Sequence, residues 1–191
     1  MQDLYQDILG LVLNRAYERR RVRLASGRES DFYIDCRQVT LTAEGVYKIA
    51  KYILGLIRQE KMAVQAVGGP ALGAVPVAAA VSALSYDPSF EGEPLDTFFV
   101  RAAAKKHGKG NKVDGPALQA GLSLLLLDDV LTTGGSLLKA ARAVQELGCR
   151  VEKTLVIVDR QEGGCENLEK EGLSVVSILT RSDLEQARRE L

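Results

Sequence analysis

The sequence predicts an α/β fold in which a central, mostly parallel sheet is flanked by helices on both faces. Several short segments are almost continuously apolar, such as residues 124–127 (LLLL) and 154–158 (TLVIV). Such runs are typical of strands that are buried on both sides. They alternate along the chain with amphipathic helical patterns, of which residues 42–60 are the clearest, and this alternation is typical of a parallel sheet.

The N-terminal part of the chain predicts one helix followed by a small hairpin. Apolar residues recur at helical spacing within residues 2–19. Two short strands are expected at 21–25 and 31–35, on either side of a turn that contains Gly27. A second helix is expected at 42–60, because its apolar residues fall on one face.

The remaining elements follow the same alternation. Strands are expected at 63–69, 95–101, 122–129, 150–162 and 173–180, and helices at 74–84, 136–148 and 182–191. Ser182 and Glu185 have the spacing of a capping box that would open the last helix. Residues 102–121 are basic, contain glycines and lack apolar periodicity, so we expect a flexible loop there.

Length and composition predict one domain with an aliphatic core. The chain has 191 residues, of which 46% are hydrophobic, 26% charged and only 5% aromatic. We therefore expect a single domain over residues 1–191. Its N-terminal elements (about 1–40) and its flexible loop (about 101–115) are expected as additions to the α/β core.

Charge and cysteine content argue against several classes of protein. The formal net charge is +0, which argues against a nucleic-acid partner bound through a basic surface. No apolar run approaches the ~20 residues of a membrane span, and the N-terminus lacks a signal-peptide pattern. Three widely spaced cysteines and one histidine offer few ligands for zinc. We expect reduced cysteines and a cytoplasmic protein.

The most specific functional signal is LLLLDDVLTTGGS, residues 124–136. Asp128 and Asp129 follow a predicted strand, at the end where open α/β sheets bind ligands. Thr132 to Ser136 supply hydroxyls and glycine backbone at the start of a helix, where amide groups bind phosphate. Adjacent carboxylates suit sugar hydroxyls, so the stretch indicates a ribose beside its phosphate. The alternative is a solvated strand end with an N-cap.

This stretch resembles the phosphoribosyl pyrophosphate (PRPP) binding motif of type I phosphoribosyltransferases. The resemblance implies the type I phosphoribosyltransferase fold, with a small N-terminal hood and a flexible catalytic loop. In that family the acids hold the ribose hydroxyls and the loop holds the 5-phosphate. The implied PRPP-binding residues here are Asp128, Asp129, Val130, Leu131, Thr132, Thr133, Gly134, Gly135 and Ser136.

Three further stretches resemble orotate phosphoribosyltransferases. RLASGRESDFYID (23–35) resembles the hood motif, VRAAAKKHGKG (100–110) the catalytic loop, and VDRQEGG (158–164) the strand end whose arginine contacts the orotate carboxylate. The resemblance implies that orotate is bound by Thr132, Arg160, Tyr33 and Ile34. The alternative for Arg160 is a structural salt bridge to Asp159 or Glu162.

The basic loop fits the chemistry of a leaving diphosphate. The loop carries positive charge that can neutralise the charge gathering on pyrophosphate. Its basic residues are Arg101, Lys105, Lys106, His107 and Lys109. Without the other motifs, a solvated basic face would be the simpler interpretation. In the resembled family this loop (101–111) reaches the neighbouring subunit, which implies a homodimer. The family usually has lysine after the loop arginine, whereas this chain has Ala102.

AVGGPALGAVP (66–76) resembles the family's pyrophosphate loop, which adds Leu72 and Gly73 to the implied PRPP-binding residues. Mg²⁺ is the expected cofactor. It would be held mainly by substrate oxygens and water, since no dedicated protein site is evident.

The catalytic residues implied by these resemblances are Arg101, Lys105, His107, Asp128 and Asp129. The expected reaction joins orotate to PRPP and gives orotidine 5'-monophosphate and pyrophosphate, a step of pyrimidine (UMP) biosynthesis. Two alternatives remain at this point. One is a PRPP-sensing regulator on the same fold, and the other is a purine phosphoribosyltransferase.

Overall fold

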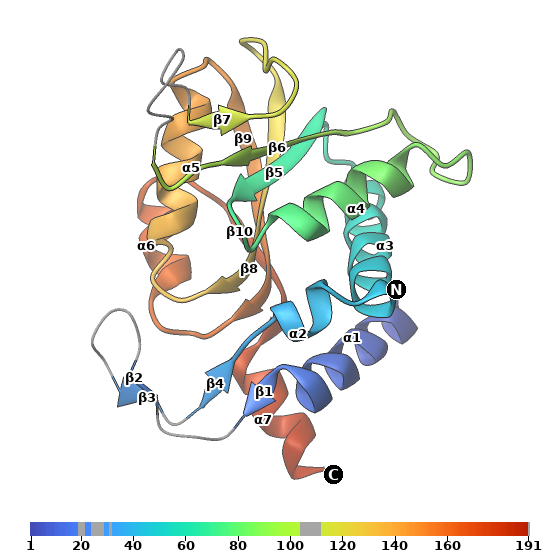
Figure 1. The fold of residues 1–191 in the computed structure, drawn as a ribbon, viewed down its shortest axis with the longest axis vertical. Coiled ribbons are helices and arrows are strands. Elements are labelled where there is room, and N and C mark those ends of the chain that lie inside the picture. The colour runs from blue at the N-terminus through green and yellow to red at the C-terminus, as the bar shows by residue number, and fades with distance from the viewer. Residues whose placement is uncertain (19–21, 24–28, 31, 104–111, 191) are drawn as a thin grey trace.

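The computed structural model describes residues 1–18, 22–23, 29–30, 32–103 and 112–190. Its centre is a six-stranded sheet in the order β10-β9-β8-β5-β6-β7 (Figure 1). The first five strands in this order are parallel, and the edge strand β7 is antiparallel to β6. The expected mostly parallel sheet is therefore confirmed. Its strands are β5 (Ala66–Pro70), β6 (Asp96–Val100), β7 (Val113–Asp114), β8 (Ser123–Leu131), β9 (Arg150–Asp159) and β10 (Val175–Thr180).

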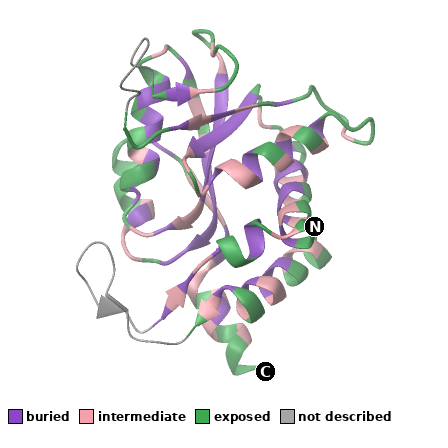
Figure 2. Cartoon of the chain, viewed as in Figure 1, coloured by how far each residue is buried: buried purple, intermediate pink, exposed green. Residues whose placement is uncertain are grey.

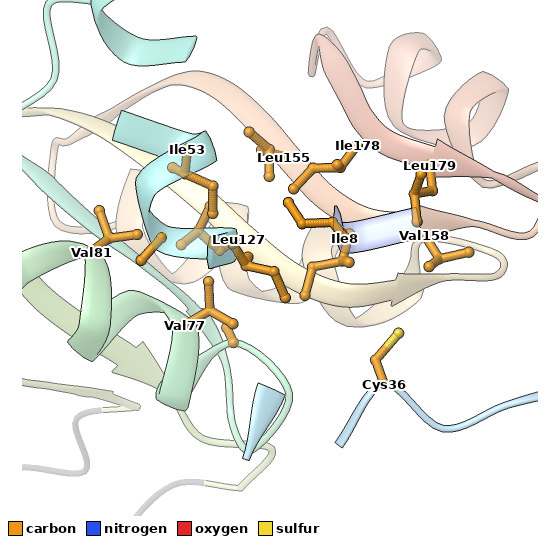
Figure 3. Close-up of a cluster of buried hydrophobic side chains, with 14 of the residues drawn as sticks. Ile8, Cys36, Ile53, Val77, Val81, Leu127, Leu155, Val158, Ile178 and Leu179 are labelled. Carbon is orange, nitrogen blue, oxygen red and sulfur yellow. The ribbon is translucent and has the colours of Figure 1, made fainter. Parts of the chain in front are cut away.

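Helices cover both faces of the sheet, and the four leucines of β8 serve both layers. Leu125 and Leu127 pack in a cluster with α1 (Gln2–Arg15), α3 (Ala43–Gln59) and α4 (Val75–Ser85). Figure 3 shows Leu127 of this cluster among Ile8, Ile53 and Val77. Leu124 and Leu126 pack on the opposite face, in a cluster with α5 (Gly135–Gln145) and α6 (Gly164–Lys170). Alternate residues of one strand thus enter different cores, which explains the unbroken apolar run.

The strands at the centre are buried while the outer faces of the helices are exposed (Figure 2). The helix expected at 42–60 is α3, and its N-cap is Thr42, whose hydroxyl accepts a hydrogen bond from the Gly45 amide at 3.1 Å. Within the described part of the chain, no helix is long and apolar enough to cross a membrane.

The N-terminal elements differ in detail from the expected ones. Helix α1 ends at Arg15, because the next residues form β1 (Tyr17–Glu18), which pairs antiparallel with β4 (Tyr33–Ile34). A second antiparallel pair joins β2 (Val22–Arg23) to β3 (Glu29–Ser30). The strands expected at 21–25 and 31–35 thus exist in shorter form, but each has another partner. The expected turn at Gly27 lies outside the described residues.

Five short elements of the described chain were not expected from the sequence: β1, β3, α2 (Arg37–Thr40), β7 and α6. The capping box of α7 (Arg181–Arg189) is also placed differently. It is formed by Thr180 and Asp183, so the Ser182/Glu185 assignment is wrong. The Ser182 hydroxyl instead donates to the side-chain oxygen of Gln161 at 2.7 Å, a tertiary contact that sequence spacing does not reveal.

Candidate active site

The carboxyl ends of the parallel strands form one edge of the sheet, and most of the predicted site residues that the structure describes lie along this edge. The exceptions are Tyr33 and Ile34, which lie in β4 of the hood. Four stretches of the chain meet at this edge because their strands are parallel neighbours. They contribute Leu72 and Gly73 after β5, Arg101 after β6, Asp128 to Ser136 at the end of β8, and Arg160 after β9.

The two aspartates lie inside β8, two to three residues before its end. Asp128 pairs with Val156 of β9, and the ladder continues to Leu131. The strand expected to stop at residue 129 is therefore longer. Asp128 is only 8% exposed, so the alternative of a solvated strand end is wrong for this residue.

The Asp128 carboxylate is held by hydrogen bonds on both oxygens. The Ser136 hydroxyl donates to Oδ2 at 3.0 Å, and the Asp129 amide donates to Oδ1 at 3.0 Å. Burial and the neighbouring Asp129 charge raise the pKa of Asp128 to about 7, while the Ser136 bond acts in the opposite direction. This carboxylate therefore exchanges its proton near neutral pH.

Gly73 brings the loop after β5 against this acidic pair. A Cβ atom at residue 73 would lie 2.5 Å from Oδ1 of Asp129 and 2.7 Å from Oδ1 of Asp128. These separations are too short for any side chain in the present arrangement. The backbone of the implied pyrophosphate loop thus lies directly against the two acids that the resemblance assigns to the ribose.

Thr132 to Ser136 form the turn from β8 into α5. Gly134 has φ +80° and is the N-cap, so α5 begins with amide groups that no side chain caps. The first turn of α5 carries no acidic residue. The positive end of the helix dipole and these amides make the turn suitable for phosphate.

Helix α6, which was not expected from the sequence, packs against this turn. The Asn167 side chain donates to the Thr133 carbonyl at 3.1 Å. Gly164 lies so close that a Cβ there would be 2.6 Å from the Thr132 carbonyl oxygen and 2.6 Å from Leu131. The Gly163–Gly164 pair before a helical pattern is the sequence signal for this contact.

Arg160 is buried at the end of β9, where it contacts a carboxylate and an aromatic ring. Its guanidinium pairs with Glu162 at 2.9 Å, which is one of the two alternatives that the sequence left open. It also lies 4.3 Å from the centre of the Phe32 ring. Arg181 of α7 contacts the same ring at 4.4 Å, and Tyr17 stacks on it at 5.8 Å.

Phe32 therefore joins the hood to the end of β9 and to the C-terminal helix. It is 1% exposed and directly precedes Tyr33 and Ile34 of β4, the residues implied to contact orotate. Neither Phe32 nor Arg181 was expected at the site. Nothing in the sequence spacing indicates the stack, because Phe32, Arg160 and Arg181 come from separate parts of the chain.

Arg101 lies at the end of β6, where its Nε pairs with Asp114 of β7 and its guanidinium lies 5.6 Å from the Phe99 ring. The Arg101 amide donates to the Lys112 carbonyl, so the two ends of the basic loop are joined. The other predicted loop residues, Lys105, Lys106 and His107, lie outside the described residues.

Comparison with known proteins places this fold and site in a class. The phosphoribosyl transferase domain family matches residues 38–180. A solved orotate phosphoribosyltransferase of Mycobacterium tuberculosis H37Rv, in complex with PRPP, superimposes with a TM-score of 0.75 at 34% identity and covers 95% of this chain and 99% of that one. The fold is that of the type I phosphoribosyltransferases.

The curated relatives show to which family of type I phosphoribosyltransferases the chain belongs. An orotate phosphoribosyltransferase of Sorangium cellulosum is 42% identical and covers 92% of this chain and 90% of the relative. That of Thermosynechococcus vestitus is 40% identical and covers 97% and 95%. The chain belongs to the orotate phosphoribosyltransferase family.

The raised pKa of Asp128 predicts a pH-dependent effect of removing its charge. The folded state retains this proton up to about pH 7, whereas an unfolded aspartate loses it near pH 4. Stability contributed by the protonated form is therefore lost as pH rises through this window. We expect Asp128→Asn to abolish activity. At pH 8 it should raise the free energy of unfolding by on the order of 1–3 kcal/mol and therefore raise the melting temperature.

The gain should shrink towards pH 4.5, where both proteins carry an uncharged side chain. Asp96→Asn, on the exposed end of β6, is the matched control and should leave the melting temperature nearly unchanged at both pH values. A gain at pH 8 that persists at pH 4.5 would show that the buried charge is not its cause.

The Phe32 stack predicts a selective effect on the orotate end of the site. Phe32→Leu removes the ring face that both arginines contact, so we expect the KM for orotate to rise about fivefold with little change in the KM for PRPP. Phe98→Leu is the control, because Phe98 is equally buried but packs against the opposite face of the sheet. Equal effects of the two variants on the orotate KM would contradict the positioning role.

Proposed function

We propose that this protein transfers the 5-phosphoribosyl group from PRPP to orotate, releasing pyrophosphate and forming orotidine 5'-monophosphate for UMP biosynthesis. The observation that carries the proposal is the contact of Gly73 with Asp128 and Asp129, beside the uncapped start of α5. It brings together the loop that would bind the diphosphate, the two acids that would bind the ribose and the turn that would bind the 5-phosphate. The curated relatives named orotate phosphoribosyltransferase support the choice of base.

The ribose phosphate would be held from two sides. Asp128 and Asp129 would accept hydrogen bonds from the ribose hydroxyls, and Thr132 to Ser136 would bind the 5-phosphate through their amides and hydroxyls. Ser136 links the two functions, because its hydroxyl already donates to Asp128. Such fixed positioning supplies much of the rate in reactions of this type.

The base would lie between the end of β9 and the hood. Arg160 would pair with the orotate carboxylate, with Thr132, Tyr33 and Ile34 completing its surroundings. Orotate N1 then attacks C1 of the ribose as the bond from C1 to the pyrophosphate oxygen breaks. The electron pair leaves with pyrophosphate. Orotate N1 can bind as an anion, so no strong general base is needed.

The leaving group needs positive charge. Arg101, Lys105, Lys106 and His107 of the loop would neutralise pyrophosphate as it departs. Mg²⁺ would bind between the acids and the diphosphate of PRPP. It prefers hard oxygen ligands, such as the phosphates of PRPP and the carboxylates of Asp128 and Asp129. No three acidic, histidine or cysteine side chains converge within the described chain. Substrate oxygens and water would therefore supply most of its ligands, and the ion would stabilise the charge of the diphosphate.

Ala102 favours one rival function, a regulator that binds PRPP without turnover, because it removes a charge directed at pyrophosphate. A purine phosphoribosyltransferase is a weaker rival, since it leaves the buried Arg160 and the hood contact unexplained.

The direct test mixes the protein with Mg²⁺, PRPP and orotate and follows the loss of orotate absorbance. We expect turnover that requires all three components and yields pyrophosphate stoichiometrically. Tight PRPP binding by calorimetry without turnover would establish the regulator instead. Turnover with adenine or hypoxanthine but not with orotate would overturn the proposed base.

We infer a homodimer in the cytoplasm, in which loop 101–111 serves the partner's site. Exposed Leu41, Tyr47 and Tyr86 offer apolar surface for a second copy, and the three free cysteines suit a reducing compartment.

Mixing subunits tests the shared loop. Asp128→Asn and Lys105→Ala should each be inactive alone, but co-expressed subunits should regain about a quarter of wild-type activity, because half the dimers contain one intact site. No recovery would mean that each loop serves its own subunit.

A further inference from the structure

A basic pocket adjoins the ribose acids on the side away from Arg160. It has a volume of about 240 Å³ and opens between the ends of β5 and β6 and the first turns of α5. It is lined by Pro70, Ala71, Val100, Arg101, Ala102, Lys112, Ser136, Lys139 and Ala140. The pocket continues into the site already described, since Ser136 both lines it and donates to Asp128.

The ionisable lining residues all carry positive charge. They are Arg101, Lys112 and Lys139, whereas the whole chain has a formal net charge of +0. Arg101 is paired with Asp114. Lys112 and Lys139 are exposed and form no ion pair with any residue in the described ranges. Their charges are therefore available to an anion that enters the pocket.

Lys139 is directed into this pocket by the geometry of α5. Ser136 and Lys139 are three residues apart, so they share one face of the helix. Ala140 completes that face and also lines the pocket. The lysine thus lies one turn beyond the serine that touches the ribose acid. A long flexible ammonium side chain at this position suits a phosphate oxygen near C1 of the ribose.

Ala102 forms part of the opposite wall. The methyl side chain leaves open the space that a lysine at residue 102 would occupy, and Lys139 borders the same space from α5. Pro70 and Ala71 complete the wall and lead directly to Gly73, in the loop implied to bind pyrophosphate. The pocket is therefore bounded by diphosphate-binding elements rather than by the 5-phosphate turn alone.

We propose that Lys139, assisted by Lys112, binds the diphosphate of PRPP and the departing pyrophosphate, and supplies the charge that Ala102 lacks. This role rests on the proposed function, because it assumes that PRPP occupies the site.

The test compares Lys139→Ala with Arg142→Ala. Arg142 is on the same helix, but it is exposed and pairs with Glu171 away from the pocket. Lys139→Ala should weaken pyrophosphate binding by calorimetry and raise the KM for PRPP, each about tenfold, without changing the KM for orotate. Arg142→Ala should match the wild type in all three measurements, and Lys139→Arg should retain most of the affinity.

A double variant tests whether a lysine at residue 102 can replace Lys139. Adding Ala102→Lys to Lys139→Ala should restore most of the lost pyrophosphate affinity, because either lysine reaches the same pocket. If Lys139→Ala binds pyrophosphate as tightly as Arg142→Ala does, the proposal is overturned. It is equally overturned if Ala102→Lys restores nothing.

These outcomes are separable from failure of the proposed function. Pyrophosphate binding is measured without orotate and without turnover. A wild-type protein that binds pyrophosphate through Lys139 but does not convert orotate would retain the pocket assignment and lose the enzyme assignment.

Discussion

Burial of the Asp128 carboxylate is the constraint on which the rest of the active site depends. A carboxylate that is 8% exposed and adjacent to a second acid is costly unless hydrogen bonds compensate for lost water. Ser136 and the Asp129 amide provide them. The start of α5 must therefore lie where its serine reaches back to β8, and residue 73 must be small enough to approach both acids. One buried charge thereby determines the positions of two loops.

A second set of contacts determines the position of Arg160 at the end of β9. Phe32 lies between Arg160 and Arg181, and Tyr17 stacks on the same ring. Through this ring the hood, the end of β9 and the C-terminal helix are in mutual contact. Arg188 of the same helix also lies over Tyr17 at 5.3 Å. Both ends of the chain therefore help to position Arg160, although neither carries a recognisable binding motif.

The parallel sheet and the turn from β8 into α5 were predictable because they depend on local pattern. An apolar run such as Leu124 to Leu127 forms a doubly buried strand when it lies in a parallel sheet. Thr132 to Ser136 form a turn because their glycines directly precede a helical pattern, and such a turn is suited to phosphate. Prediction was poorest where several residues compete for the same local role. Thr180 rather than Ser182 caps α7, because Ser182 is engaged by Gln161, and the hood strands pair with partners that their own sequences do not specify.

The sequence by itself determined the main strands and helices of the α/β core and the family resemblance, since these follow from hydrophobic period and short motifs. Through that resemblance it also indicated which residues would surround a ribose. Only the tertiary structure decided that Asp128 is buried within its strand, that Phe32 lies between two arginines, and that Lys139 shares a pocket with Ala102. These facts depend on distances between segments far apart in the chain. Such distances are set by how the layers pack, which no local pattern encodes.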